Sequence, residues 1–180
     1  MFKWRPLFFW LSKQRTFTNF HLIHTFSNQF SFILVNCKDT DVLRTHYNKI
    51  DNVYKDSLNN KDTILIITDV SVKNNVATLV SHIWKSHSII NKSVYHTMNV
   101  NSTEAKLFVI RYGIDQATKL HDILKIVIIT EAILAMKQIF DTSIHLHQIH
   151  SIAISKSFRQ FFNRNPHNSI LFWNCLDSIK

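Results

Sequence analysis

Three acidic residues stand at positions where a carboxylate often carries chemistry. Asp69 directly follows the apolar run 63–68 (TILIIT), and Glu131 directly follows a similar run at 125–130 (KIVIIT). Glu104 is the only other glutamate of the chain. Carboxylate oxygens are the ligands that Mg²⁺ and Mn²⁺ prefer, and grouped carboxylates repel one another unless a cation neutralises them. We therefore expect Asp69, Glu104 and Glu131 to share a site for divalent ions.

Each of these acids also has an ordinary structural interpretation. Glu104 lies three residues after Asn101, which is the spacing of a helix capping box. Asp69 and Glu131 fit solvated turn residues at the ends of strands. Their combination with the order of the elements favours the metal site.

The two apolar runs are the clearest elements of the sequence. Both are continuous and rich in β-branched residues, which predicts central strands that are buried on both faces. In open α/β sheets, ligands gather outside the carboxyl ends of the strands. Asp69 and Glu131 should therefore meet at one edge of the sheet.

The residues between these runs predict two more strands and a helix. The Asn-rich turn at 73–75 should join the first strand to a second at 76–84, because Asn tolerates positive φ. A third strand at 89–98 should follow a turn at 87–88. Asn101 or Ser102 then caps a helix. Its expected inner face consists of five residues at helical spacing: Ala105, Phe108, Val109, Tyr112 and Ala117.

The remaining elements complete an α/β pattern. Helices are expected at 132–140 and 149–162, and a last strand at 169–173. The order is three strands, a helix, a strand, two helices and a strand. We predict a mixed five-stranded sheet flanked by helices, in a domain at 62–180. Residues 1–61 should form a basic, aromatic N-terminal extension or the remnant of an upstream domain, with a polar helix at 39–58.

Composition narrows the function. The chain has 180 residues and a formal net charge of +9, which favours an anionic partner such as nucleic acid. Gly113 is the only glycine, and both the Walker loop and the dinucleotide fingerprint need several, so no nucleotide cofactor is expected. No apolar run reaches the roughly 18 residues of a membrane span, so no membrane partner is expected. Cys37 and Cys175 lack zinc-site spacing and are interpreted as free thiols.

Four sequence segments carry a resemblance to a known family. They are TILIITDVSVKNN, NSTEAKLFVIRYGIDQA, KIVIITEAILAMKQIF and SILFWNC. Together they resemble the ribonuclease H domain of fungal LINE-type (non-LTR) retrotransposon polyproteins over about two-thirds of the chain. The family's D-x-S motif matches Asp69 to Ser71, and its T-E-A-E/K-L motif matches Thr103 to Leu107.

The resemblance implies a ribonuclease H-like fold and hydrolysis of the RNA strand of RNA/DNA hybrids with two Mg²⁺ or Mn²⁺ ions. It implies that Asp69 bridges both ions, that Glu104 holds one of them and contacts the 2′-hydroxyl region, and that Glu131 holds the other. Ser71, Asn74 and Asn101 are expected to contact the substrate.

Three departures from the family pattern predict weak or lost activity. Glu131 replaces the family's aspartate, Val70 is bulky, and the final helix with its fourth acid is missing, so that only Asp177 remains as a stand-in. A non-catalytic, nucleic-acid-binding remnant of such a domain is therefore the alternative function. A small organelle protein with a cleaved leader is a third possibility, since no acid precedes Asp39.

One feature of the sequence leaves two interpretations open. Phe161 and Phe162 lie beside Lys156, Arg159 and Arg164. This pattern fits a basic, aromatic surface for nucleic acid as well as it fits a helix that buries its phenylalanines and solvates its basic side.

Overall fold

The computed structural model describes residues 25–33, 40–98, 100–140 and 148–174. Its six strands form one sheet in the order β1-β6-β5-β2-β3-β4. The strands are β1 (Phe30–Ile33), β2 (Thr63–Lys73), β3 (Val76–Lys85), β4 (Ser88–Met98), β5 (Lys125–Thr130) and β6 (Ser169–Asn174). The helices are the short 3₁₀ turn η1 (Ser27–Gln29), α3 (Thr40–Asn59), α4 (Ser102–Ala117), α5 (Ile133–Phe140) and α6 (Gln148–Arg164).

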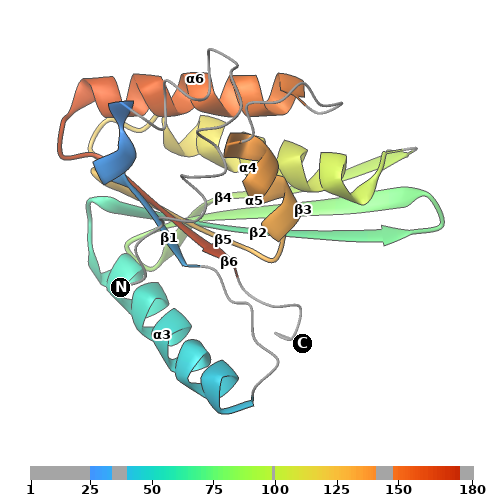
Figure 1. Cartoon of the computed structure of the whole chain (residues 1–180), viewed down its shortest axis with the longest axis horizontal. Coiled ribbons are helices and arrows are strands. Elements are labelled where there is room, and N and C mark those ends of the chain that lie inside the picture. The colour runs from blue at the N-terminus through green and yellow to red at the C-terminus, as the bar shows by residue number, and fades with distance from the viewer. Residues whose placement is uncertain (1–24, 34–39, 99, 141–147, 175–180) are drawn as a thin grey trace.

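The sheet is covered on both faces (Figure 1). Helices α4, α5 and α6 lie on one face, and α3 lies on the other. The larger apolar cluster fills the α4–α6 side and includes Ile66, Ile128 and Phe172. The smaller cluster lies on the α3 side and includes Leu65 and Trp173. Neighbouring residues of one strand therefore face opposite layers, as the two-residue period of a strand requires.

The predicted α/β fold is confirmed. Strands β2 to β6 are the five that the sequence predicted, and their connections give a mixed sheet with β2, β5 and β6 parallel. The structure adds a sixth strand from the N-terminal segment, because β1 pairs in parallel with β6 from Phe30↔Ile170 to Ile33↔Trp173.

Aromatic contacts attach β1 to the α4–α6 side. The ring of Phe30 lies edge-on to Phe140 and Phe158, at 5.4 Å between centroids in both cases, and to Phe162 at 4.9 Å. Phe32 stacks on Phe172 at 5.6 Å. Part of the predicted N-terminal extension is thus built into the sheet.

The first strand extends further than predicted. It was expected to end before Asp69, but β2 continues to Lys73 because β3 pairs with it along its length, from Leu65↔Trp84 to Lys73↔Val76. The predicted Asn turn is confirmed, with φ values of 51° at Asn74 and 60° at Asn75. The second hairpin turns at Ser86 and His87, one residue earlier than expected.

The predicted inner face of α4 was partly wrong. Ala105, Val109 and Ala117 are buried as expected, whereas Phe108 is 38% exposed and Tyr112 is half-buried. Both rings lean over the edge strand β4 onto Tyr95, at 5.9 Å from Phe108 and 5.3 Å from Tyr112. The residues that α4 buries instead against the sheet are Leu107, Ile110, Gly113 and Ile114.

A hydroxyl network accompanies these rings at the β4 edge. The Ser93 hydroxyl lies 2.9 Å from the Tyr112 hydroxyl. Hydrogen bonding with Ser93 lowers the pKa of Tyr112, whereas hydrogen bonding with Tyr112 raises the pKa of Tyr95. Polar partners therefore hold the two tyrosines at the sheet edge.

The structure decides between the two interpretations of α6. Phe161 and Phe162 are buried, at 0% and 3% exposure. The Arg164 guanidinium donates hydrogen bonds to the backbone oxygens of Thr118 and Leu120, just beyond the end of α4. The phenylalanines are therefore core residues and do not form a surface for bases.

None of the described helices is long and apolar enough to cross a membrane.

Candidate active site

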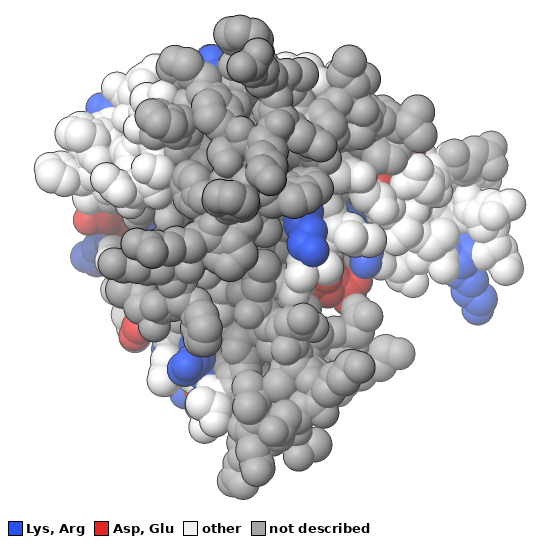
Figure 2. Space-filling view, in the orientation of Figure 1, with Lys and Arg blue, Asp and Glu red and all other residues white. Residues whose placement is uncertain are grey.

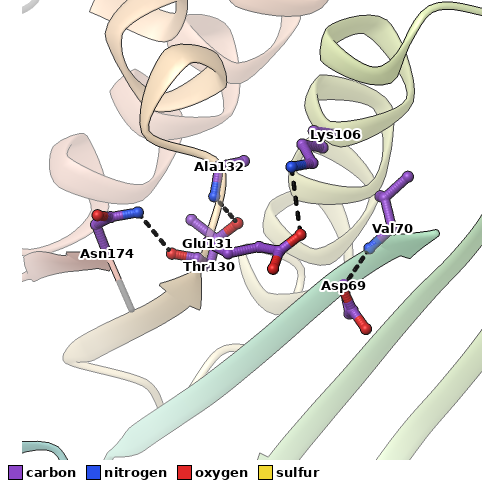
Figure 3. A network of polar contacts seen from close by, with 7 residues as sticks. All are labelled: Asp69, Val70, Lys106, Thr130, Glu131, Ala132 and Asn174. Atoms are coloured by element: carbon purple, nitrogen blue, oxygen red, sulfur yellow. Dashed lines mark hydrogen bonds and ion pairs between the residues drawn. The ribbon is translucent and has the colours of Figure 1, made fainter. Parts of the chain in front are cut away.

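Strand register relates Asp69, on β2, to Glu131, which directly follows the neighbouring parallel strand β5. The last paired residues of β2 and β5 are Thr68 and Thr130, and each acid is the next residue of its chain segment. The Asp69 side chain is exposed, and its Oδ1 accepts a hydrogen bond of 2.7 Å from the Val70 amide. Figure 3 shows Asp69 and Val70 on opposite sides of β2.

The turn that carries Glu131 is fixed by hydrogen bonds to Thr130. The Thr130 hydroxyl accepts a bond of 3.2 Å from the Ala132 amide, and the Thr130 carbonyl accepts one of 3.2 Å from Asn174 Nδ2 on β6. Thr130 and Asn174 are each 2% exposed. The backbone at Glu131 is thus held between β5, β6 and the start of α5 (Figure 3).

Glu104 lies in the first turn of α4, as predicted. The Asn101 side-chain oxygen accepts a hydrogen bond of 2.8 Å from the Glu104 amide, so Asn101 is the helix cap. The partial positive charge of a helix N-terminus favours a carboxylate at this position. Glu104 is half-buried.

The structure adds a residue that sequence reasoning missed. Lys106 reaches from α4 toward the sheet, and its Nζ lies 3.2 Å from Glu131 Oε1. The two side chains are only 24% and 22% exposed. The contact links the first half of α4 to the turn after β5. Its partners are far apart in sequence, so no local pattern indicated it.

The three acids have donor atoms that suit divalent metal ions, but their positions do not form a complete metal site. Three carboxylates supply the hard oxygen donors that Mg²⁺ and Mn²⁺ prefer. Across the described part of the chain, however, no group of three or more His, Cys, Asp or Glu side chains stands where it could hold a metal ion. The Glu131 carboxylate instead faces an ammonium group.

The three predicted substrate contacts occupy different environments. Ser71 is exposed on β2, two residues beyond Asp69 and therefore on the same side of the strand. Asn74 is exposed in the hairpin turn after β2. Asn101 caps α4 with its side-chain oxygen. Asp177, the stand-in for a fourth acid, lies outside the described residues, as do Cys37 and Cys175.

Comparisons with known proteins bear on the fold. No protein-family model and no curated protein sequence matches the chain. The N-terminal ribonuclease H domain of a Mycobacterium tuberculosis protein, solved as a fusion with maltose-binding protein, has a TM-score of 0.51 and 14% identity, and the match covers 63% of this chain and 86% of that chain.

Two further structures have lower scores. LC11 ribonuclease H1 in complex with an RNA/DNA hybrid has a TM-score of 0.49 and 15% identity, over 63% of this chain and 86% of that chain. The protease-reverse transcriptase of prototype foamy virus has a TM-score of 0.44 and 15% identity, over 61% of this chain and 17% of that chain. The predicted retrotransposon origin stays a prediction. The sheet order, the helices on both faces and the mycobacterial domain together show that this chain has a ribonuclease H-like fold.

Proposed function

We propose that the protein binds RNA/DNA hybrids where the pairing of β2 with β5 ends, and that it hydrolyses their RNA strand slowly. Asp69, Glu104 and Glu131 are the proposed catalytic and metal-holding residues, with Mg²⁺ or Mn²⁺ as the cofactor. The observation that supports the proposal is the register of β2 against β5, in which the paired residues Thr68 and Thr130 directly precede Asp69 and Glu131.

The proposed chemistry is attack of water on a phosphodiester of the RNA strand. The phosphorus–oxygen bond to the leaving sugar breaks, and that sugar oxygen takes up a proton. Bound divalent ions would supply a more acidic water and stabilise the leaving oxygen. Asp69 is exposed, so divalent ions held by it would face the solvent from which the phosphate of the substrate arrives. The net charge of +9 favours approach of the nucleic acid.

Two features support a low rate. Glu131 is longer than aspartate by one methylene, and a misplacement of about 1 Å can cost about 100-fold in rate. Its carboxylate also lies against Lys106 at 3.2 Å. The same two features favour the second candidate function, a hybrid-binding protein without catalytic activity.

The test is cleavage of a labelled RNA/DNA hybrid in Mg²⁺ and in Mn²⁺, with binding of the same hybrid measured in parallel. Asp69→Asn should lower the cleavage rate by about 100-fold or more and leave hybrid binding within a few-fold. Asp122→Asn is the matched control, because Asp122 is exposed and precedes the opposite end of β5. Cleavage by Asp69→Asn at the wild-type rate would contradict the proposed site. Tight binding without cleavage by the wild type would establish the second candidate.

A further inference from the structure

The Lys106–Glu131 pair is the strongest ionic contact at the proposed site. About three-quarters of each side chain is shielded from solvent, and the charged atoms lie 3.2 Å apart. The other described ion pairs, Lys55–Asp51 and Arg111–Asp115, join residues four apart within single helices and are more exposed. Lys106–Glu131 instead joins α4 to the sheet.

Burial makes this contact persistent. An ammonium or a carboxylate that is largely removed from water is costly to leave without an opposite charge. Lys106 projects over the turn after β5, and Figure 3 shows its amino group directed at the Glu131 carboxylate. Glu131 therefore already has a positive charge beside it, whatever the concentration of metal ions in solution.

A divalent ion that uses Glu131 must meet that charge. Either the carboxylate turns away from Lys106, which leaves the ammonium poorly solvated, or the ion binds beside the ammonium and is repelled by it. Both routes weaken the binding of the ion. We infer that Lys106 is an internal cation that competes with divalent metal for Glu131, and that it sets the metal concentration the site requires. This inference rests on the proposed function.

Lys106 is on this account a positioning residue, and replacing it should strengthen metal binding. Lys106→Met keeps an apolar stem and removes the charge. It should tighten Mn²⁺ binding by about tenfold, the scale of a partly buried ion pair. Lys106→Arg restores a cation and should bind Mn²⁺ as the wild type does. Lys137→Met is the matched control, because Lys137 is an exposed cation on α5.

The experiment measures Mn²⁺ affinity by calorimetry or by the resonance signal of free Mn²⁺, on the full chain and without nucleic acid. Circular dichroism checks that each variant is folded. The double variant Lys106→Met/Glu131→Gln should show no tightening relative to Glu131→Gln, because the competition needs both partners.

Each outcome has a definite meaning. Tightening in Lys106→Met alone, lost in the Glu131→Gln background, is the expected result. Equal tightening in Lys137→Met, or unchanged affinity in Lys106→Met, overturns the competition. If Asp69→Asn abolishes Mn²⁺ binding while Lys106→Met leaves it unchanged, the proposed metal site is supported and only the proposed role of Lys106 is contradicted. Absence of Mn²⁺ binding from the wild type and all variants overturns both proposals.

Discussion

One methylene distinguishes Glu131 from an aspartate, and it affects which partner the carboxylate reaches. The hydrogen bonds of Thr130 to Ala132 and Asn174 fix the backbone on which this side chain stands. From that fixed point, the glutamate extends to Lys106 on α4. An aspartate would reach about 1.3–1.5 Å less far by ordinary bond lengths.

Glu131→Asp should therefore raise the rate of hybrid cleavage by several-fold. The shorter carboxylate loses its contact with Lys106 and holds a divalent ion without that competing cation. Single-turnover cleavage at saturating Mn²⁺ measures the change. The gain should not add to that of Lys106→Met, because both substitutions act on one ion pair. A rate as low as that of Glu131→Ala would contradict this explanation.

At the scale of elements, α4 lies close to the sheet at Gly113. A Cβ atom built there would lie 2.6 Å from Ile66 Cγ2 and 3.3 Å from Ser81 Oγ. Ile66 and Ser81 are fully buried, and the Ile66 methyl group is attached directly to its Cβ, so the contact cannot be relieved by a rotating side-chain end. The single glycine of the chain is thus explained by close packing of a helix on a strand.

Gly113→Ala should lower the free energy of unfolding by up to about 2 kcal/mol. Alanine normally stabilises a helix by about 1 kcal/mol relative to glycine, but overpacking a tight core costs about 1–3 kcal/mol. Urea unfolding measures the balance. Gln116→Ala, on a half-buried position of the same helix, should change stability by less than about 0.5 kcal/mol. Stabilisation by Gly113→Ala would show that the helix can move away from β2.

Phe30→Ala tests whether β1 belongs to the core. Its ring contacts Phe140, Phe158 and Phe162, so its removal should cost about 2–4 kcal/mol of unfolding free energy. Ser31→Ala, on an exposed position of the same strand, is the control and should be nearly neutral. A loss below about 0.5 kcal/mol in Phe30→Ala would mean that β1 contributes little to the fold.

The sequence predicted the elements whose composition alone decides their structure. The run 125–130 is one strand as expected, and the Asn turn before Val76 follows from positive φ at two asparagines. The inner face of α4 could not be predicted, because Phe108 and Tyr112 satisfy a helical period yet find their partner on the edge strand. Strand β1 is too short to show a period, and only its parallel pairing with β6 defines it.

The sequence indicated which residue types could form the site, but not the side-chain contacts that these residues make. The ends of the two apolar runs indicated where Asp69 and Glu131 would lie, and the residues before them, Thr68 and Thr130, are paired. Strand β2, however, continues past Asp69 to Lys73. Lys106 gave no such indication, since its partner is 25 positions away and only the packing of α4 on the sheet and against α5 brings them together. Side-chain orientation at a site depends on such contacts, which composition and periodicity do not contain.

At the scale of the whole molecule, one face of the described residues shows how the charged side chains are distributed. On the face shown in Figure 2, the described Lys and Arg side chains lie in separate places, with Asp or Glu beside several of them. The net charge of +9 attracts nucleic acid at long range.

Hybrid affinity should accordingly fall by about tenfold or more between about 50 and 200 mM salt, because each neutralised phosphate releases a counterion. Fluorescence anisotropy with a labelled hybrid measures the slope of affinity against salt. Asp69→Asn should give the same slope, since it leaves the basic residues in place. A flat salt dependence would show that binding does not rest on charge.

The pairing of β1 with β6 also determines when β1 can join the sheet during synthesis of the chain. Phe30 lies opposite Ile170, so the partner of β1 is made about 140 residues after it. At a synthesis rate of about 5–20 residues per second, this strand waits roughly 7–28 s for that partner. Its phenylalanines spend that interval without their final neighbours, while β2, β3 and β4 can already form hairpins. The pairing of β1 with β6 is thus a late step of folding, and a step at which a chaperone can act.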